Sequence, residues 1–318
     1  MEQLMSDSKN HIAFIFPGQG SQSLGMLSDF AEVAEVKHTF EQASDLLGYD
    51  LWSLCQNGPE DELNQTNKTQ PALLTASVAL WRVWQTKGSL PSIVAGHSLG
   101  EYSALVCAGI LDFEQGVKLV EQRGLFMQQA VSAGVGKMAA IIGLDDDKVL
   151  SACEQSANGE IVSPVNYNSP GQIVIAGNAD AVDRAIIACK DSGAKRAMPL
   201  SVSVPSHCML MKPASEQLEK ALETISLAPS TSIELVNNVD VAIEKDEQRI
   251  KDALVRQLYC PVRWSETIQF LANRGIDSLV ECGAGKVLSG LNRRIDRNLT
   301  SYQALTKSSL NQSVESLI

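Results

Sequence analysis

Short apolar runs that end abruptly at turn residues constrain the fold of this 318-residue chain more than any other feature. The run 12–16 (Ile-Ala-Phe-Ile-Phe) stops at Pro17, and the run 92–95 (Ser-Ile-Val-Ala) stops at Gly96. Such short, continuous runs are typical of strands that are buried on both faces of a parallel sheet. The alternation of these strands with helices predicts an α/β fold with a parallel sheet. Helical patterns lie at 26–47, 70–87, 98–108 and, with Asp112 as the N-cap, up to residue 132.

The segment 134–203 interrupts this alternation with a different order of elements. Its order is βαββαβ, which is the pattern of a ferredoxin-like unit. We therefore expect an α/β-hydrolase-like body, residues 1–133 and 204–318, that carries a ferredoxin-like small subdomain at 134–203. The strands of this subdomain are predicted at 137–143, 161–166, 172–176 and 195–200, and its helices at 145–157 and 180–192.

The pattern of the body resumes after this insertion. Strands are predicted at 201–205, around 233–243 and at 277–281, and helices at 209–224, 246–259 and 264–273. No internal repeat or low-complexity tract interrupts them. The predicted architecture is therefore one α/β body with an insertion, and not two domains in series.

The charge and hydropathy pattern exclude several classes of function. Lys and Arg number 26 against 37 Asp and Glu, which gives a formal net charge of −11. This balance argues against nucleic-acid binding and against adhesion to anionic membranes, since both require a basic face. No apolar run reaches about 18 residues, so no membrane span is predicted.

The cysteines indicate the compartment. They are seven in number, form no CxxC motif, and have no histidine at metal-ligand spacing. This pattern predicts reduced thiols and no structural metal. The first residues lack a basic segment followed by a long apolar run, so we expect no signal peptide. Together these features predict a cytoplasmic protein.

The strongest catalytic motif is the segment 96–100 (Gly-His-Ser-Leu-Gly), which fits G-x-S-x-G. A predicted strand precedes it and a helical pattern follows it, which is the context that a nucleophile elbow requires. In such an elbow the glycines permit a tight turn and expose the nucleophile, here Ser98. The backbone N–H of Leu99 can then stabilise an oxyanion. A glycine-rich turn with an incidental serine is the alternative.

A serine nucleophile needs a base, and the chain has four histidines. His11 precedes the first strand, and His38 lies in a charged helical stretch. His97 adjoins Ser98, and adjacent side chains on a tight turn diverge. His207, in a loop after an apolar run, therefore remains as the candidate base, with a structural role as the alternative.

The position of His207 in the chain is unusual for a hydrolase. Ordinary α/β-hydrolases place the histidine after the acid and late in the chain. Here 111 residues (318 − 207) follow it, and no acidic residue stands out as its partner. A simple esterase is therefore disfavoured, and a backbone or side-chain amide carbonyl is the alternative group that could orient the imidazole.

A second glycine-rich turn, residues 16–22 (Phe-Pro-Gly-Gln-Gly-Ser-Gln), follows the first strand. It is not a dinucleotide-binding fingerprint, because Ser23 stands where the third glycine of G-x-G-x-x-G belongs. A loop in this place can supply a second oxyanion N–H, and Gln19 is the natural donor. A plain tight turn is the alternative.

Arg123 lies in a helical stretch that is largely apolar on one side. One interpretation is an exposed arginine that pairs with Glu121 or another neighbour. The other is a guanidinium fork that binds a substrate carboxylate through two hydrogen bonds.

Six short motifs occur in order along the chain. They are 16–21 (Phe-Pro-Gly-Gln-Gly-Ser), 96–102 (Gly-His-Ser-Leu-Gly-Glu-Tyr), 122–124 (Gln-Arg-Gly), 166–171 (Asn-Tyr-Asn-Ser-Pro-Gly), 204–208 (Val-Pro-Ser-His-Cys) and 257–262 (Gln-Leu-Tyr-Cys-Pro-Val). Together they resemble the malonyl-CoA:acyl-carrier-protein transacylases of fatty-acid synthesis. The βαββαβ insertion also matches the small subdomain of that family. Cys260 departs from the family, in which asparagine is expected, and this bears on local packing only.

The resemblance implies a role for each candidate residue. It implies Ser98 as the nucleophile, His207 as the base and Arg123 as the group that binds the substrate carboxylate. It also implies Leu99 and Gln19 as the two oxyanion donors. The main-chain carbonyl that orients the histidine is implied to be that of Gln257. The implied reaction transfers malonyl from malonyl-CoA to the phosphopantetheine thiol of acyl carrier protein through a malonyl-serine, without a metal or another cofactor.

Other functions stay open at this point. A serine hydrolase or thioesterase acting on acyl-CoA would use water in place of the carrier thiol, and a non-catalytic scaffold would not be acylated. A different extender acyl group is also compatible with these motifs. A monomer is the default expectation.

An acyl carrier protein is acidic, so docking to this acidic chain would need a local basic patch. The sequence offers two clusters, namely Lys286, Arg293, Arg294 and Arg297 near the C-terminus, and Lys190, Lys195 and Arg196 in the small subdomain. A solvated helix face is the alternative for either cluster.

Overall fold

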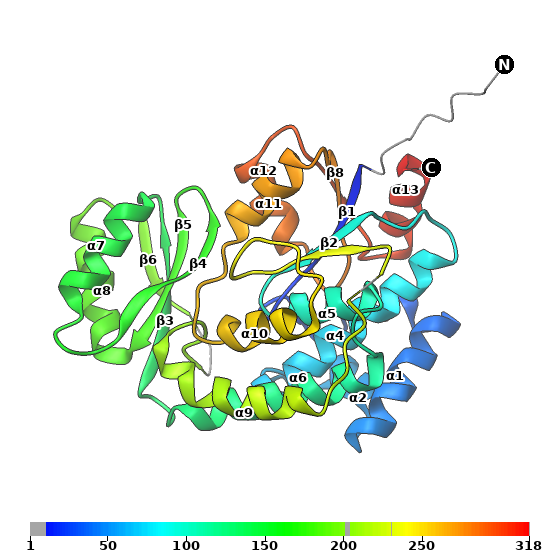
Figure 1. Cartoon of the computed structure of the whole chain (residues 1–318), viewed down its shortest axis with the longest axis horizontal. Helices are drawn as coiled ribbons and strands as arrows, with labels where there is room; N and C mark the ends of the chain where they lie inside the picture. Colours follow the sequence, from blue (N-terminus) through cyan, green and yellow to red (C-terminus); the bar gives the residue numbers. More distant parts are fainter. Residues whose placement is uncertain (1–10, 201–203, 230, 318) are drawn as a thin grey trace.

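The computed structural model describes residues 11–200, 204–229 and 231–317, and it contains two separate sheets (Figure 1). The first is parallel throughout, with the strand order β7 (Glu234–Val236), β2 (Ile93–Gly96), β1 (Ile12–Phe16), β8 (Ser278–Glu281) and β9 (Thr300–Gln303). The second is antiparallel, with the order β4 (Val162–Ser169), β5 (Gln172–Asn178), β3 (Gly136–Ile142) and β6 (Arg196–Pro199). The predicted α/β class with a parallel sheet is confirmed.

The side chains of β1 explain why the parallel sheet has helices on both faces. All five of its residues are buried, and successive side chains point to opposite faces. Phe14 and Phe16 pack edge-on against Trp81 on one face, in a core shared with α4, α5 and α6. Ala13 and Ile15 join a second core on the other face, which includes side chains of α11 and α12.

The helices of the parallel-sheet body have these bounds: α1 (Ala34–Leu47), α2 (Leu51–Asn57), α3 (Glu60–Leu63), α4 (Thr66–Gln85), α5 (Gly100–Cys107), α6 (Phe113–Ala130), α9 (Lys212–Glu223), α10 (Glu247–Gln257), α11 (Trp264–Asn273), α12 (Val287–Ile295) and α13 (Lys307–Leu317). Asp112 caps α6 as predicted, since its side chain accepts a hydrogen bond from the Gln115 N–H. None of the helices among the described residues has the length and apolarity that crossing a bilayer requires.

Residues 136–199, here called the antiparallel unit, lie at one end of the molecule and are drawn in green in Figure 1. Helices α7 (Asp146–Ser156) and α8 (Ala179–Asp191) pack on one face of its sheet, which confirms the predicted βαββαβ order. The opposite face packs against Cys208, next to the candidate base. The exact division of the chain at 133/134 and 203/204 stays our proposal, and residues 201–203 lie outside the described part of the chain.

The structure differs from the sequence-based expectations in the loops. The helix expected from residue 26 begins at Ala34, after a 3-10 turn at Ser28–Phe30. Of the strands expected around 233–243, only Glu234–Val236 joins the sheet, and a positive φ of 54° at Val241 marks the irregular segment that follows. Of the strand expected at 201–205, the described residues Val204 and Pro205 are not in a strand.

The pairing of β1 with β2 determines where a site can form. Phe16 lies opposite Gly96 in the register, so the two strands end side by side. The glycine-rich turn after β1 and the G-x-S-x-G turn after β2 therefore meet at one edge of the sheet. This is the edge at which ligands bind in open parallel sheets.

Candidate active site

Ser98 occupies the sharp turn between β2 and α5, where its backbone has a positive φ of 54°. For a residue with a Cβ this conformation costs about 1–3 kcal/mol and persists only where the surroundings enforce it. The flanking glycines are sterically required. A Cβ on Gly96 would lie 1.9 Å from the carbonyl carbon of Gly100, and a Cβ on Gly100 would lie 2.0 Å from the oxygen of Phe16. The turn therefore has the geometry of a nucleophile elbow.

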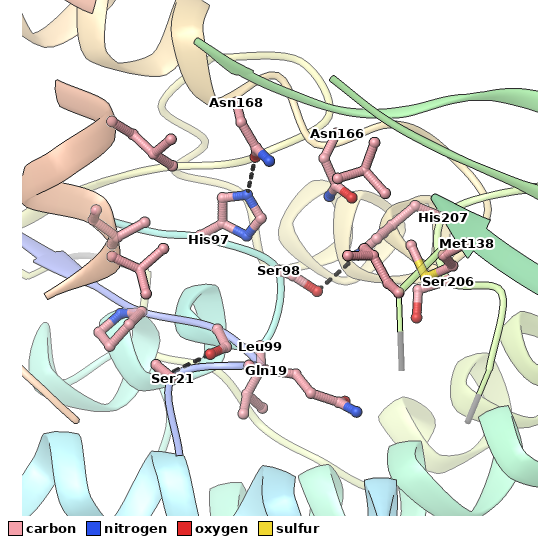
Figure 2. A pocket seen from close by; sticks show the side chains of 18 of the residues that line it. Gln19, Ser21, His97, Ser98, Leu99, Met138, Asn166, Asn168, Ser206 and His207 are labelled. Atoms are coloured by element: carbon pink, nitrogen blue, oxygen red, sulfur yellow. Dashed lines mark hydrogen bonds between the residues drawn. The ribbon is translucent and has the colours of Figure 1, made fainter. Parts of the chain in front are cut away.

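His207 lies next to this serine, as Figure 2 shows, and 109 residues further along the chain. Its Nε2 is 2.8 Å from the Ser98 Oγ, and its Nδ1 is 2.7 Å from the main-chain oxygen of Gln257. Because that carbonyl can only accept, Nδ1 carries the hydrogen and Nε2 is free to accept the serine proton. A main-chain carbonyl thus occupies the place that an acid holds in ordinary triads.

The environment keeps the His207 imidazole neutral. The side chain is only 3% exposed. Burial, followed by the positive charge of Arg123, lowers the pKa of His207 to about 3, and the hydrogen bond to the Gln257 carbonyl opposes this shift only in part. A neutral imidazole is the form that can act as a base.

The adjacent histidine, His97, points away from the serine hydroxyl, as its place in the sequence predicts (Figure 2). Its Nε2 lies 2.8 Å from the Oδ1 of Asn168, and its ring packs at a centroid distance of 5.5 Å from Trp264. Burial lowers its pKa. His97 therefore links the elbow to the end of β4 in the antiparallel unit and is separate from the Ser98–His207 pair.

Arg123 is buried and does not lie on a solvated helix face, since its side chain is 1% exposed. One terminal nitrogen donates to the Oε1 of Gln70 at 2.9 Å, and the other donates to the Oε1 of Gln257 at 2.9 Å. Its Nε has no partner among the described residues. Burial lowers the pKa of Arg123, because desolvation disfavours its charge. A buried cation whose hydrogen-bond partners are neutral amides is well suited to bind a carboxylate.

The two candidate oxyanion donors, Gln19 and Leu99, line the same pocket as Ser98 and Arg123. Among the described residues, neither of their backbone N–H groups donates a hydrogen bond to another protein group. The Gln19 side chain extends toward Thr66, with 3.5 Å between Nε2 and Oγ1. The structure thus brings all the sequence-predicted site residues together, with Gln257 behind the pocket.

The far wall of the pocket comes from elements to which the sequence analysis assigned no role in the site, although Asn166 and Asn168 belong to the motif 166–171. The antiparallel unit contributes Met138, Asn166, Asn168, Gln172 and Val174, and α12 contributes Val287, Leu288 and Leu291. The buried carboxylate of Glu281 accepts hydrogen bonds from the backbone N–H groups of Leu288 and Ser289. Glu281 therefore fixes the start of α12, and the only available signal was an acidic residue at the end of a predicted strand.

Another residue that the sequence analysis missed is Asn238, whose side chain bonds directly to the elbow. Its Oδ1 accepts from the Ser98 N–H at 2.7 Å, and its Nδ2 donates to the Gly96 oxygen at 2.6 Å. The polar pair 237–238 directly after a short apolar run was the available signal. Within the described residues, no group of at least three His, Cys, Asp or Glu side chains could hold a metal ion.

The two predicted basic clusters are exposed and lie on different elements. Arg293 and Arg294 belong to the last turn of α12, and Lys195 and Arg196 lie at the start of β6. Arg294 donates to the Oε1 of Gln172 at 2.6 Å, so this cluster adjoins the antiparallel unit. Their role in docking stays a prediction.

Comparison with known proteins agrees with this geometry. Residues 13–301 match the family model of the acyl transferase domain. The malonyl CoA-acyl carrier protein transacylase of Escherichia coli K12 is 60% identical over 291 residues, which is 91% of this chain and 94% of that protein. The Haemophilus influenzae protein of the same name is 57% identical over 309 residues, which is 96% of this chain and 99% of that protein.

Solved structures give the same result. A malonyl-transacylase in complex with its type II PKS acyl-carrier protein superposes with a TM-score of 0.94 at 57% identity, over 96% of this chain and 99% of that chain. An acyl carrier protein S-malonyltransferase from Vibrio cholerae gives a TM-score of 0.93 at 58% identity, over 95% and 99% of the two chains. The chain therefore belongs to the acyl transferase family, in its group of malonyl-CoA:acyl-carrier-protein transacylases.

Proposed function

We propose that this chain transfers the malonyl group from malonyl-CoA to the phosphopantetheine thiol of acyl carrier protein, through a malonyl ester on Ser98. The observation that carries the proposal is the hydrogen-bonded Ser98–His207 pair in one pocket with the buried Arg123. The Ser98–His207 pair supplies a nucleophile and its base, and Arg123 supplies a site for a carboxylate.

In the first half-reaction, Nε2 of His207 takes the proton of the Ser98 hydroxyl while Oγ attacks the thioester carbonyl carbon. The developing oxyanion lies against the backbone N–H groups of Leu99 and Gln19, which are preorganised for it. The C–S bond then breaks, and His207 returns its proton to the sulfur of CoA. The products are free CoA and malonyl-Ser98.

The second half-reaction is the chemical reverse with a different thiol. His207 takes the proton of the phosphopantetheine thiol, and the sulfur attacks the ester carbonyl of malonyl-Ser98. The bond to Oγ breaks, and His207 protonates the serine. No atom changes its oxidation state in either half, so the transfer needs no redox cofactor.

Arg123 accounts for the choice of a dicarboxylic acyl group. A malonyl carboxylate would pair with the buried guanidinium, whereas an acetyl group would bring no charge to it and would leave it with its amide partners, Gln70 and Gln257. The specificity therefore comes from one buried charge in a chain whose net charge is negative.

We further propose that the protein acts in the cytoplasm. All seven cysteines are free thiols, and six of them are buried. Reduced thiols are the rule in cytoplasmic proteins. Bacterial malonyl transacylases are also the relatives that this chain resembles.

The test is CoA release from malonyl-CoA and acetyl-CoA, measured with and without acyl carrier protein. We expect one equivalent of CoA per enzyme without carrier, continuous release with carrier, and a strong preference for malonyl-CoA. Continuous release without carrier would instead identify a hydrolase, and equal rates for the two acyl groups would contradict the role of Arg123.

A further inference from the structure

Glu101 is a buried carboxylate that the transfer mechanism does not use. It follows Ser98 by three residues, in the first turn of α5, and is only 1% exposed. A buried carboxylate is unfavourable unless hydrogen bonds replace its water. Its Oε2 accepts two of them, from the backbone N–H of Asn238 at 3.0 Å and from Nε2 of Gln257 at 2.7 Å. One oxygen thus joins the elbow helix to two distant segments of the chain.

The first of these segments holds the backbone of the nucleophile. The Asn238 side chain accepts from the Ser98 N–H and donates to the Gly96 oxygen, so it bridges the two sides of the elbow. Ser98 has the positive φ that needs such support. An acceptor and a donor are both required here, and the asparagine amide provides them on two separate atoms, Oδ1 and Nδ2.

The second segment holds the base and the arginine. The Gln257 amide nitrogen donates to the Oε2 of Glu101 at 2.7 Å and to the main-chain oxygen of Ser98 at 3.1 Å. Its amide oxygen must then face Arg123, from which it accepts at 2.9 Å. The main-chain oxygen of the same residue accepts from His207. The Glu101 carboxylate, through the shorter of the two bonds, and the Ser98 main-chain oxygen therefore determine the orientation of this side-chain amide together.

We infer that Glu101 and Asn238 are positioning residues for the transfer reaction. They hold the strained Ser98 backbone and the Gln257 amide in the arrangement that aligns nucleophile, base and arginine. Neither side chain needs to touch the substrate for this role. The inference rests on the proposed transfer function.

The chain offers a matched control for Asn238 in its neighbour, Asn237. Asn237 is also buried, accepts from the Asp240 N–H at 2.7 Å and donates to the Ala242 oxygen at 3.1 Å. It makes the same two kinds of bond to backbone groups, but within its own loop and away from Ser98. Asn238→Asp and Asn237→Asp each keep the accepting oxygen and lose one donor to a carbonyl.

The experiment compares kcat and KM for malonyl-CoA in these two variants and follows their thermal unfolding. For Asn238→Asp we expect kcat to fall about 100-fold, from the loss of one buried hydrogen bond and the unfavourable contact of two oxygens. KM should change little, since the Gln257–Arg123 contact is unaffected. Asn237→Asp should lower Tm by about as much as Asn238→Asp does, because each loses one buried hydrogen bond, but it should keep kcat within about threefold of the wild type. An equal loss of kcat in both variants, or none in Asn238→Asp, would overturn the inference.

A second pair tests Glu101 by rescue. Glu101→Ala removes the acceptor for both donors and should lower kcat/KM about 100-fold. Glu101→Gln offers an amide oxygen at the same place and should recover the rate to within about tenfold of the wild type. If the glutamine variant were as impaired as the alanine variant, hydrogen bonding at this position would not be the reason for the effect, and the inference would fail.

A reagent independent of malonyl separates this inference from the proposed function. A fluorophosphonate forms an ester with the Ser98 Oγ by displacing fluoride, and its rate reports the nucleophile, its base and the oxyanion donors without involving a malonyl carboxylate. We expect that rate to fall in Asn238→Asp and to be retained in Asn237→Asp. If the wild type labels rapidly but transfers no malonyl, the proposed function is wrong while the positioning role stands. If labelling is unchanged in Asn238→Asp, the positioning role is wrong.

Discussion

The two sides of the pocket are built differently. The side formed by the parallel-sheet body carries Ser98 and His207, whose φ angles of 54° and 65° are the positive ones among the non-glycine pocket residues that the structure describes. The side formed by the antiparallel unit carries apolar and amide side chains, among them Met138, Val174 and Asn166, on strands where these residues have no positive φ. Backbone strain is therefore concentrated where the reacting groups lie.

This contrast teaches how the two tasks of the site are divided. Reacting groups need a fixed geometry, and buried hydrogen bonds from several segments of the body supply it. The opposite wall needs only to shape the pocket and exclude water, so ordinary strand residues suffice. Substitutions on the body side should consequently have large effects on rate, and those on the antiparallel side should have small ones.

His207→Ala should give the largest effect in this comparison. Without the imidazole, nothing near the Ser98 hydroxyl can take its proton, and general-base catalysis contributes about 10²–10⁴-fold. We expect kcat/KM for malonyl transfer to fall about 10³-fold. A loss below tenfold, in a variant with a normal unfolding curve, would remove His207 from the role of base.

Arg123→Ala should come next and should depend on the acyl group. Removing the guanidinium costs the malonyl carboxylate its hydrogen-bonded charge partner, so kcat/KM for malonyl-CoA should fall about 10²-fold or more. Acetyl transfer, measured with the same preparation, should fall far less. A loss of the same size for both acyl groups would mean that Arg123 supports the pocket and does not recognise the carboxylate.

The pH dependence of kcat/KM tests the body side of the pocket through an effect of intermediate size. The active base is the neutral form, and a lowered pKa keeps that form at more acidic pH. Because the pKa of His207 is lowered to about 3 from its ordinary value of 6.5, protonation of His207 should not reduce the rate between pH 8 and 5. For a histidine with an ordinary pKa, the fraction in the neutral base form would be about 30-fold lower at pH 5 than at pH 8.

The same profile in Arg123→Ala sharpens this test. The charge of Arg123 is the second cause of the lowered pKa, after burial, so its removal should move the acid limb of the profile to higher pH. Burial raises the pKa of Glu101 to about 7, so the wild-type profile is compared with that of Glu101→Gln, which has no carboxyl group at this position. An acid limb near pH 6.5 in both proteins would contradict the buried environment of His207.

Asn168→Ala should give the smallest effect, because it belongs to the antiparallel side. It removes the hydrogen bond to His97, which links this side to the elbow but not to the reacting atoms. One such bond contributes about 0.5–1.5 kcal/mol, so kcat/KM should fall no more than about tenfold. A loss as large as that of His207→Ala would break the proposed division between the two sides.

Local sequence patterns were sufficient to predict the parts of the site that lie within one motif. The elbow could be predicted because Gly96 and Gly100 are sterically required within five residues of chain. His207 followed by elimination among four histidines. The carbonyl that orients it lies 50 residues away and came only from the family resemblance.

The parts that could not be predicted depend on contacts between distant segments. Asn238 bonds to Ser98 across 140 positions, and no local pattern encodes that approach. Helix α12, whose start is fixed by Glu281, was likewise missed, as were the short α2 and α3 and the C-terminal β9 and α13. Irregular segments such as that around Val241 follow tertiary contacts more than local propensity.

The most direct test of the central claim is to map the acyl group on the protein itself. The wild-type enzyme would be mixed with malonyl-CoA alone, quenched in acid, digested and analysed by mass spectrometry, with a second sample exposed to acyl carrier protein before quenching. We predict malonyl on the peptide that contains Ser98 in the first sample, and its disappearance with malonylation of the carrier in the second. Malonyl on any other residue, or a Ser98 ester that the carrier does not discharge, would contradict the account.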